Sequence, residues 1–290
     1  MKCSLFKTIE KRKRTMMTPR VAAIHDMSGF GRCSLTVAIP ILSAMGVQCC
    51  PLPTAFLSTH TGGFEGFTFL DMTDEMSKVA DHWASLGLTF QAVYSGFLGS
   101  ERQIGVVENF ICRFRGPDTV VVVDPVMVAT SGDRLITEDA VSALKELLLP
   151  LATVLTPNIP EAEILSGMTI RSAADMEAAA RAISEQYGCA VLCKGGHQIN
   201  DADDLLWRCG SGKWFHGKRI NNPNTHGTGC TLSSAIASNL AKGFDLDTAV
   251  ERAKAYISGA LGAMLDLGRG SGPMNHMFDL KSIYCTEKAD

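Results

Sequence analysis

A glycine-rich turn in the C-terminal third of the chain has the residue types of a phosphate-binding site. The run Asn224-Thr225-His226-Gly227-Thr228-Gly229-Cys230-Thr231 leads directly into a helical pattern over Thr231 to Lys242. Glycines let the backbone turn sharply and approach a ligand closely. The first turn of a helix presents free N–H groups and the positive end of the helix dipole. The backbone N–H groups of Gly227, Thr228 and Gly229 are therefore candidates for stabilising a phosphoryl group in transfer.

Cys230 stands at the start of that predicted helix. A thiol at a helix N-terminus gives up its proton more readily than a free thiol, and it could accept the proton of an attacking hydroxyl group. The alternative is a glycine-rich loop with a buried structural cysteine. These residues alone leave both interpretations open.

Three further polar signals follow predicted strands. Thr156-Pro157-Asn158-Ile159-Pro160-Glu161 contains two oxygen-bearing side chains, Asn158 and Glu161, of a kind that suits Mg²⁺. The competing interpretation is a capping box, in which Asn158 caps the next helix and Glu161 is its partner.

Asp124 comes directly after Thr119 to Val123 and could orient water bound to Mg²⁺, or could be a turn residue before Pro125. Lys194, in Lys194-Gly195-Gly196-His197, could reach phosphate oxygens or be a surface lysine.

Several well-known motifs are absent from the sequence. No segment fits the Walker A pattern or the GxGxxG dinucleotide fingerprint. HExxH and the GxSxG nucleophile elbow are also missing. A phosphate site without a Walker A motif indicates a different class of kinase.

Short apolar runs alternate with amphipathic segments along the chain. We expect strands at Val21–Ile24, Val47–Leu57, Ala92–Ser95, Thr119–Val123, Ala152–Thr156 and Ala190–Cys193, and a hairpin over Leu205–Trp207 and Lys213–Phe215. Helical patterns cover Leu35–Met45, Met76–Leu86, Gln103–Phe114, Glu138–Leu149, Ala173–Gln186, Thr231–Lys242 and Leu246–Leu265. This alternation predicts an α/β fold whose mainly parallel sheet is covered on both faces. Ligands of such sheets bind beyond the carboxyl ends of the strands, where the four polar signals fall.

Composition narrows the class of protein. The chain has 290 residues, a net charge of -3, and ten cysteines without a CxxC pair. The acidic balance argues against nucleic acid as a partner, and no apolar run is long enough to span a bilayer. We expect a cytoplasmic protein with reduced cysteines. The basic run Lys11-Arg12-Lys13-Arg14 favours a disordered extension over residues 1–19, with a single domain over residues 20–290.

From Asp124 onward, the chain resembles the hydroxymethylpyrimidine (phosphate) kinases of thiamine synthesis, in the ribokinase-like superfamily. The matching stretches are Asp124 to Gly132, Thr156 to Glu163, Lys194 to His197 and His226 to Ser233. The resemblance implies an α/β/α sandwich that uses ATP and Mg²⁺. It also implies that Cys230 is the base and that Gly227 to Gly229 form the anion hole. Asp124, Asn158, Glu161 and Lys194 would then serve Mg-ATP, with Asp124 and Glu161 holding the metal largely through water.

Before Asp124, the chain is similar to pyridoxal (pyridoxamine) kinases of the same superfamily. The stretches that match are His25 to Ser34, Pro51 to Ala55, Ser58 to Gly62 and Tyr94 to Ser100. This resemblance implies that His60, Thr61 and the ring of Phe97 line the substrate pocket, together with Asp26 and Ser28. Plain core packing is the alternative role for Phe97. The thiamine branch instead has a Ser-Gly-Gly-Ala-Gly turn near Gly29, which this sequence lacks.

The two resemblances together imply phosphorylation of a hydroxymethyl group on a heteroaromatic ring. Because the N-terminal half supplies the substrate pocket, we expect a pyridoxal, pyridoxamine or pyridoxine kinase of vitamin B6 salvage. The alternative is a hydroxymethylpyrimidine or phosphomethylpyrimidine kinase of thiamine biosynthesis. A non-catalytic binding protein or a sugar kinase on the same scaffold fits the motifs less well. Relatives are commonly dimers, so we expect a homodimer that binds a small-molecule substrate.

Overall fold

The computed structural model describes residues 18–61, 64–128, 135–195, 202–217, 220, 222, 227–263 and 272–279. Its described strands form one nine-stranded sheet in the order β3-β2-β1-β4-β5-β6-β7-β8-β9. They are β1 (Arg20–Phe30), β2 (Gln48–Thr59), β3 (Phe69–Asp71), β4 (Ala92–Ser95), β5 (Val120–Val123), β6 (Val154–Leu155), β7 (Ala190–Lys194), β8 (Asp204–Arg208) and β9 (Ser211–Phe215). The basic run at residues 11–14 lies outside the described residues.

The middle of the sheet is parallel and its two edges are antiparallel. Strands β2, β1, β4, β5, β6 and β7 run in parallel. At one edge β3 pairs antiparallel with β2, and at the other β8 and β9 continue as an antiparallel hairpin. The carboxyl ends of the central strands therefore meet along one side of the molecule.

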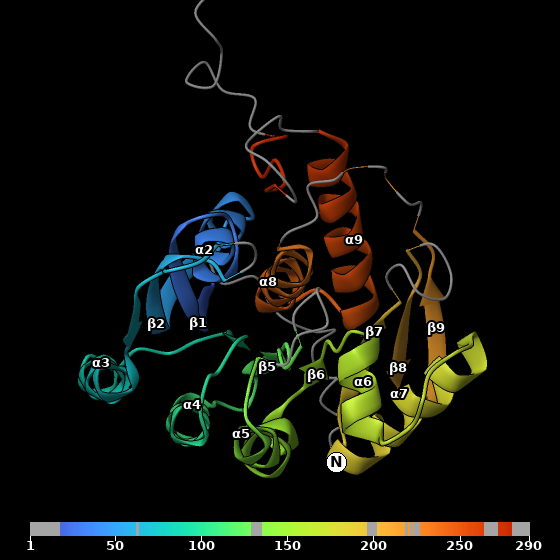
Figure 1. Ribbon diagram of the computed structural model, residues 1–290, viewed down its shortest axis with the longest axis horizontal. Coiled ribbons are helices and arrows are strands. Elements are labelled where there is room, and N and C mark those ends of the chain that lie inside the picture. Colours follow the sequence, from blue (N-terminus) through green and yellow to red (C-terminus); the bar gives the residue numbers. More distant parts are fainter. Residues whose placement is uncertain are drawn as a thin grey trace, which may run out of the picture.

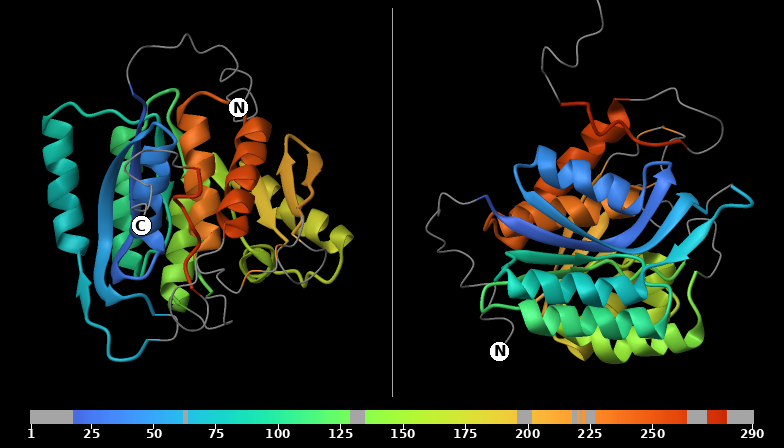
Figure 2. Two further views of the ribbon diagram at one scale, coloured as in Figure 1. Left: turned by 90° about the horizontal axis from the view of Figure 1, so that it is seen from above. Right: turned by 90° about the vertical axis from the view of Figure 1, so that its left-hand side faces the viewer.

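Helices cover both faces of the sheet, as Figures 1 and 2 show. One layer contains α2 (Ser34–Ala44), α8 (Thr228–Ala241) and α9 (Leu246–Gly262). The opposite layer contains α3 (Thr73–Ser85), α4 (Glu101–Phe114), α5 (Glu138–Ala143), α6 (Ile159–Ser166) and α7 (Ala173–Tyr187). The predicted α/β/α sandwich is confirmed.

Strand β5 shows why the sheet must be covered twice. Val120 and Val122 pack in the core beneath α2, α8 and α9, whereas Val121 and Val123 pack in the core on the other face. All four side chains are buried. A strand that is apolar on both sides is stable only between two layers of helices. No described helix is long and apolar enough to cross a membrane.

Some boundaries differ from those expected. Helix α8 begins at Thr228, not at Thr231, so Gly229 and Cys230 lie in its first turn. The helix expected over Glu138–Leu149 is α-helical only to Ala143 and continues as a wider π turn over Leu144–Leu148. Strand β3 was not expected, because its three residues are too few to show an alternating pattern.

Candidate active site

A buried ion pair joins two of the predicted site residues at the carboxyl end of the sheet. Asp124 follows β5 and Lys194 ends β7, and Lys194 Nζ lies 2.9 Å from Asp124 Oδ1. The side chains are only 14% and 3% exposed. A Cβ atom placed on Gly229 would lie 3.4 Å from Lys194 Nζ. The first turn of α8 is therefore directly beside the pair.

The turn before α8 fixes where that helix begins. Gly227 has a φ of 83°, a conformation that side chains disfavour, and a Cβ atom there would lie 2.8 Å from the carbonyl oxygen of Arg32. Thr231 donates to the Gly227 carbonyl oxygen from both its backbone N–H and its hydroxyl group. Intrahelical bonding thus starts at Thr231, and the N–H groups of Thr228, Gly229 and Cys230 are the ones that a helix leaves available for an anion. Asn224 to His226 lie outside the described residues.

Glu161 and Asn158 form the capping box that was the competing interpretation of this segment. Asn158 Oδ1 accepts the Glu161 N–H at 2.9 Å, and Glu161 Oε2 accepts the Asn158 N–H at 2.8 Å. Glu161 Oε1 also accepts the N–H of Met127 at 3.3 Å. Both residues therefore have structural tasks at the start of α6, whatever they contribute to a ligand.

The charges around Lys194 leave an excess of negative potential. Burial raises the pKa of Glu161 to about 7; Asp124 adds to this rise and Lys194 opposes it. Burial alone would lower the pKa of Lys194, but Asp124 and Glu161 raise it above its ordinary value. Lys194 thus remains a cation between two carboxyl groups, and a further cation would stabilise the second carboxylate.

The donor set fits a metal ion that keeps most of its water. Within the described ranges no three His, Cys, Asp or Glu side chains are grouped as metal ligands. Asp124 and Glu161 offer carboxylate oxygens at the sheet edge, and their mutual repulsion favours an added cation. Mg²⁺ binds through few protein groups and several waters, so these two residues would hold it there.

Two hydroxyl groups that sequence reasoning missed support Asp124. Ser233 Oγ donates to Asp124 Oδ2 at 3.2 Å, and Thr156 Oγ1 lies 3.0 Å from Ser233 Oγ. Both residues are fully buried. Ser233 follows Cys230 by three residues and so shares its helix face, a spacing that could have identified it.

His25 is a further functional candidate that sequence reasoning did not single out. Its Nε2 atom lies 3.5 Å from Cys230 Sγ, and its Nδ1 atom lies 2.7 Å from Asp26 Oδ1. Burial alone would lower the pKa of His25, but the charges of Cys230 and Asp26 raise it to about 10. The signal in the sequence was the pair His25-Asp26 at the end of a predicted strand.

The remaining substrate-pocket candidates come from β1, β2 and the segment after β4. Thr61, directly after β2 and His60, is exposed, and His60 is half-buried with its ring 4.8 Å from that of Phe64. Phe97 is half-buried and packs against the core, as its alternative role required. Ser28 is fully buried and its hydroxyl group donates to Asp26 at 3.4 Å. Ser28 therefore supports Asp26, and its contact with a substrate stays a prediction.

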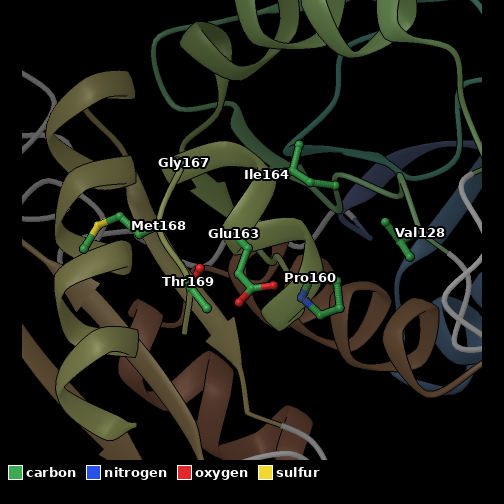
Figure 3. A pocket seen from close by; sticks show the side chains of 7 residues that line it. All are labelled: Val128, Pro160, Glu163, Ile164, Gly167, Met168 and Thr169. Carbon is green, nitrogen blue, oxygen red and sulfur yellow. The ribbon is translucent and has the colours of Figure 1, made fainter. Parts of the chain in front are cut away.

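A hollow of about 480 Å³ lies beside α6. Figure 3 shows it lined by Val128, Pro160, Glu163, Ile164, Gly167, Met168 and Thr169. Glu163 already accepts the N–H of Ile170 at 2.7 Å. The residues that line this hollow do not include Asp124, Asn158, Glu161 or Lys194, which the sequence predicts to serve Mg-ATP. Gly196 and His197, and residues 129–132, lie outside the described residues.

Comparison with known proteins identifies the family. The family model for phosphomethylpyrimidine kinase matches residues 39–275. A hydroxymethylpyrimidine/phosphomethylpyrimidine kinase from Rhizobium meliloti is 38% identical over 264 residues, which are 90% of this chain and 97% of that protein.

Solved structures of both kinds of vitamin kinase resemble this chain. A putative phosphomethylpyrimidine kinase from Bacteroides thetaiotaomicron, in a crystal form with pyridoxal, is 34% identical with a TM-score of 0.78, covering 90% of this chain and 93% of that one. A Bacillus subtilis pyridoxal kinase in an ADP complex is 26% identical with a TM-score of 0.82, covering 92% and 100%. The motifs around Cys230 and Lys194 and these matches agree, and the chain belongs to the phosphomethylpyrimidine kinase family of the ribokinase-like superfamily.

Proposed function

We propose that this kinase transfers the γ-phosphoryl group of ATP to a hydroxymethyl group on a pyrimidine ring, as a hydroxymethylpyrimidine/phosphomethylpyrimidine kinase. The observation that carries the proposal is the first turn of α8, which presents Cys230 and free N–H groups beside the buried Lys194–Asp124 pair. This arrangement combines a proton acceptor, an anion cradle and a fixed cation, which are the parts that phosphoryl transfer needs.

Each residue has a defined role in the reaction. Cys230 accepts the proton of the substrate hydroxyl group as its oxygen attacks the γ-phosphorus and ADP departs. The N–H groups of Thr228, Gly229 and Cys230 stabilise the charge that develops on the moving phosphoryl group. Lys194 holds phosphate oxygens as a point charge. Bound near Asp124 and Glu161, Mg²⁺ would neutralise phosphate charge.

The choice of a pyrimidine substrate rests on the relatives. The kinases from Rhizobium meliloti and Streptomyces coelicolor both carry the hydroxymethylpyrimidine/phosphomethylpyrimidine name, with 38% and 34% identity. The sequence favoured a B6 vitamer, with the pyrimidine as the alternative, and the relatives support that alternative better.

Pyridoxal remains a second candidate because of one specific observation. The Bacteroides thetaiotaomicron protein was crystallised with pyridoxal although it is named a putative phosphomethylpyrimidine kinase. The resemblance of the N-terminal half to pyridoxal kinases implies that His60, Thr61 and Phe97 line a pyridine pocket. A half-buried aromatic ring next to polar side chains can stack on either heterocycle.

A side-by-side kinase assay tests the proposal. ADP release is followed with hydroxymethylpyrimidine, its monophosphate, pyridoxal and pyridoxamine at matched concentrations. The proposal expects the highest kcat/KM with hydroxymethylpyrimidine. A higher kcat/KM with a B6 vitamer would replace the pyrimidine with a pyridine substrate, and no ADP release with any ring would reject the kinase function. The expected homodimer and cytoplasmic location remain predictions.

A further inference from the structure

Cys230 is the end of a chain of five polar side chains that come from two distant parts of the sequence. Cys230 Sγ on α8 lies 3.5 Å from His25 Nε2 on β1. On the other side of the ring, His25 Nδ1 lies 2.7 Å from Asp26 Oδ1. Ser28 Oγ lies 3.4 Å from the second Asp26 oxygen, and Cys33 Sγ lies 3.6 Å from Ser28 Oγ. The thiol thus has an imidazole as neighbour, and that imidazole has a carboxylate.

The imidazole ring is fixed by the packing around it. His25 is 2% exposed, and its ring centre lies 6.2 Å from that of Tyr94. A Cβ atom on Gly96 would lie 2.0 Å from His25 Cδ2, so the ring occupies space that is open only because residue 96 is glycine. A side chain held in this way cannot turn away from Cys230 without rearranging β4 and the segment after it.

The titratable groups that face His25 come from β1, α8 and β4. They are the carboxylate of Asp26 on β1 and the thiol of Cys230 on α8, with the hydroxyl group of Tyr94 on β4 as a further titratable group. Burial alone would lower the pKa of His25, and Cys230 and Asp26 together raise it to about 10. Near neutral pH, an imidazolium at this place can donate one N–H to Asp26 and the other to the sulfur.

From this geometry we infer that His25, held by Asp26, is the positioning residue that keeps Cys230 as a thiolate, ready to accept the proton of the substrate hydroxyl group. The role of the thiolate as a proton acceptor rests on the proposed function. The ion pair between His25 and Cys230 does not. The thiolate is the form of cysteine that accepts a proton, and a neighbouring His⁺ stabilises the thiolate.

The proton balance of the reaction is simple. The substrate O–H bond breaks and its proton goes to Cys230 sulfur, while the O–P bond forms and the bond between the γ-phosphorus and the bridging oxygen of ADP breaks. Cys230 then loses this proton to solvent before the next cycle, since the His25 imidazolium favours the thiolate. His25, which is 2% exposed, stays protonated throughout and acts through Cys230.

The rival arrangement is a neutral His25 beside a neutral thiol. A neutral imidazole has one unprotonated nitrogen, which can accept a hydrogen bond. Two backbone N–H groups are placed to donate one, since Phe97 N lies 3.5 Å from Nε2 and Asp26 N lies 3.0 Å from Nδ1. In that case the histidine is an acceptor that fills space in the core. The two arrangements differ in the charge on sulfur in the resting protein, which can be measured without ATP or a ring substrate.

The test is the rate at which iodoacetamide alkylates Cys230 as the pH is varied, followed by mass spectrometry of its peptide. Cys112, which is exposed on α4, gives an internal reference in the same digest. The variants are His25→Asn and Asp26→Asn. His216→Asn is the matched control, because His216 Nδ1 lies 2.8 Å from Asp203 Oδ2 in an exposed pair far along the chain.

The ion pair predicts a rate for Cys230 that stays near its maximum down to about pH 6, and that falls about tenfold or more at that pH in His25→Asn. Asp26→Asn should give a smaller loss of the same kind, and His216→Asn should change nothing. Identical rate curves for Cys230 in the wild-type protein and in a folded His25→Asn variant would overturn the inference.

A second measurement covers the case in which His25→Asn does not fold. Thiolate absorbs near 240 nm, so the absorbance difference between the wild-type protein and Cys230→Ser reports the charge on this sulfur directly. A thiolate contribution at neutral pH that Asp26→Asn reduces supports the pair, and its absence in the wild-type protein refutes it. If the variants alter alkylation of Cys230 but the wild-type protein shows no kinase turnover, the ion pair stands and the proposed function is rejected. If the wild-type protein turns over normally and the variants leave alkylation unaltered, the proposed function stands and the ion pair is rejected.

Discussion

At the scale of single residues, the Lys194–Asp124 pair connects the stability of the site to its chemistry. Removing two charges from water is costly, and their attraction together with added hydrogen bonds must offset this cost. Here Ser233 supplies one such bond to Asp124. Removing one partner leaves the other charge buried and unpaired. This lowers the free energy of unfolding more than removing both partners does.

Lys194→Met should therefore lower the free energy of unfolding by about 3–5 kcal/mol, the usual cost of breaking a buried pair. Asp124→Asn with Lys194→Met should recover much of this loss, because residue 124 then no longer carries a buried, unpaired charge. Urea unfolding of the single and double variants measures both effects. Lys213→Met is the matched control, since Lys213 and Glu251 form an exposed pair 3.0 Å apart worth at most about 1 kcal/mol. Equal losses for the single and double variants would contradict the argument.

Cys230 is the residue on which turnover should depend most. Cys230→Ala should reduce kcat by on the order of 10²–10⁴, the usual contribution of a general base. Nucleotide affinity should change little, because the N–H groups of α8 and Lys194 remain. Turnover assays and calorimetric titration with ATP separate the two effects, and Cys112→Ala on the exposed side of α4 is the control. Near-normal turnover would exclude Cys230 from the mechanism.

Most residues of the site were predictable because chemistry limits which side chains can follow a strand. Asp124 and Lys194 were predicted from polar groups at the ends of apolar runs, and Cys230 was predicted from a glycine-rich turn before a helical pattern. His25 and Ser233 were not, because their roles depend on contacts across 205 and 109 positions of the chain. Contacts of such separation are set by the packing of α8 on the sheet. The Cys230–Ser233 spacing and the His25-Asp26 pair are local signals, but they do not tell which distant side chain each residue meets.

At the scale of elements, the start of α8 decides the geometry of the site. The helical pattern was expected from Thr231, since glycines in the preceding run disfavour a helix interior. The structure begins the helix at Thr228, because Gly227 in its left-handed conformation supplies the turn and packs against the backbone before α2. Other boundaries, such as those of α4 and α7, followed their amphipathic patterns to within two residues.

Two glycines offer a matched test of this element. Gly227→Ala and Gly46→Ala both place a side chain on a left-handed backbone, with φ of 83° and 73°, which costs roughly 1–2 kcal/mol. A Cβ atom at residue 46 meets nothing within 4 Å, whereas one at residue 227 would lie 2.8 Å from the Arg32 carbonyl oxygen. Gly227→Ala should therefore be less stable in urea unfolding than Gly46→Ala. It should also lose at least about tenfold in turnover, because displaced N–H groups no longer match the transition state. Equal stability and turnover of the two variants would show that the contact with Arg32 does not position α8.

At the scale of the whole molecule, the order of strands places the two halves of the sequence on two halves of the sheet. Strands β1 to β4 lie on one side, and β5 to β9 lie on the other. Helix α8 lies in the middle, in contact with β1, β4 and β5 (Figure 1). The two resemblances of the sequence, which change at Asp124, therefore correspond to the side on which we propose that the ring binds and the side on which we propose that phosphate binds.

This division predicts separable effects on the two substrates. Phe97→Ala should raise KM for the ring substrate by about tenfold, since stacking on an aromatic face is worth roughly 0.5–1.5 kcal/mol beyond its buried area. The KM for ATP should stay within about twofold, because Phe97 follows β4, on the side of the sheet where we propose that the ring binds. Steady-state kinetics with each substrate varied in turn measures both constants. Phe215→Ala on β9, which stacks beneath Lys213, tests a ring of the opposite edge and should leave the KM for the ring substrate unchanged. Equal changes in both KM values for Phe97→Ala would mean that the ring fills the core and that substrate specificity comes from elsewhere in the pocket.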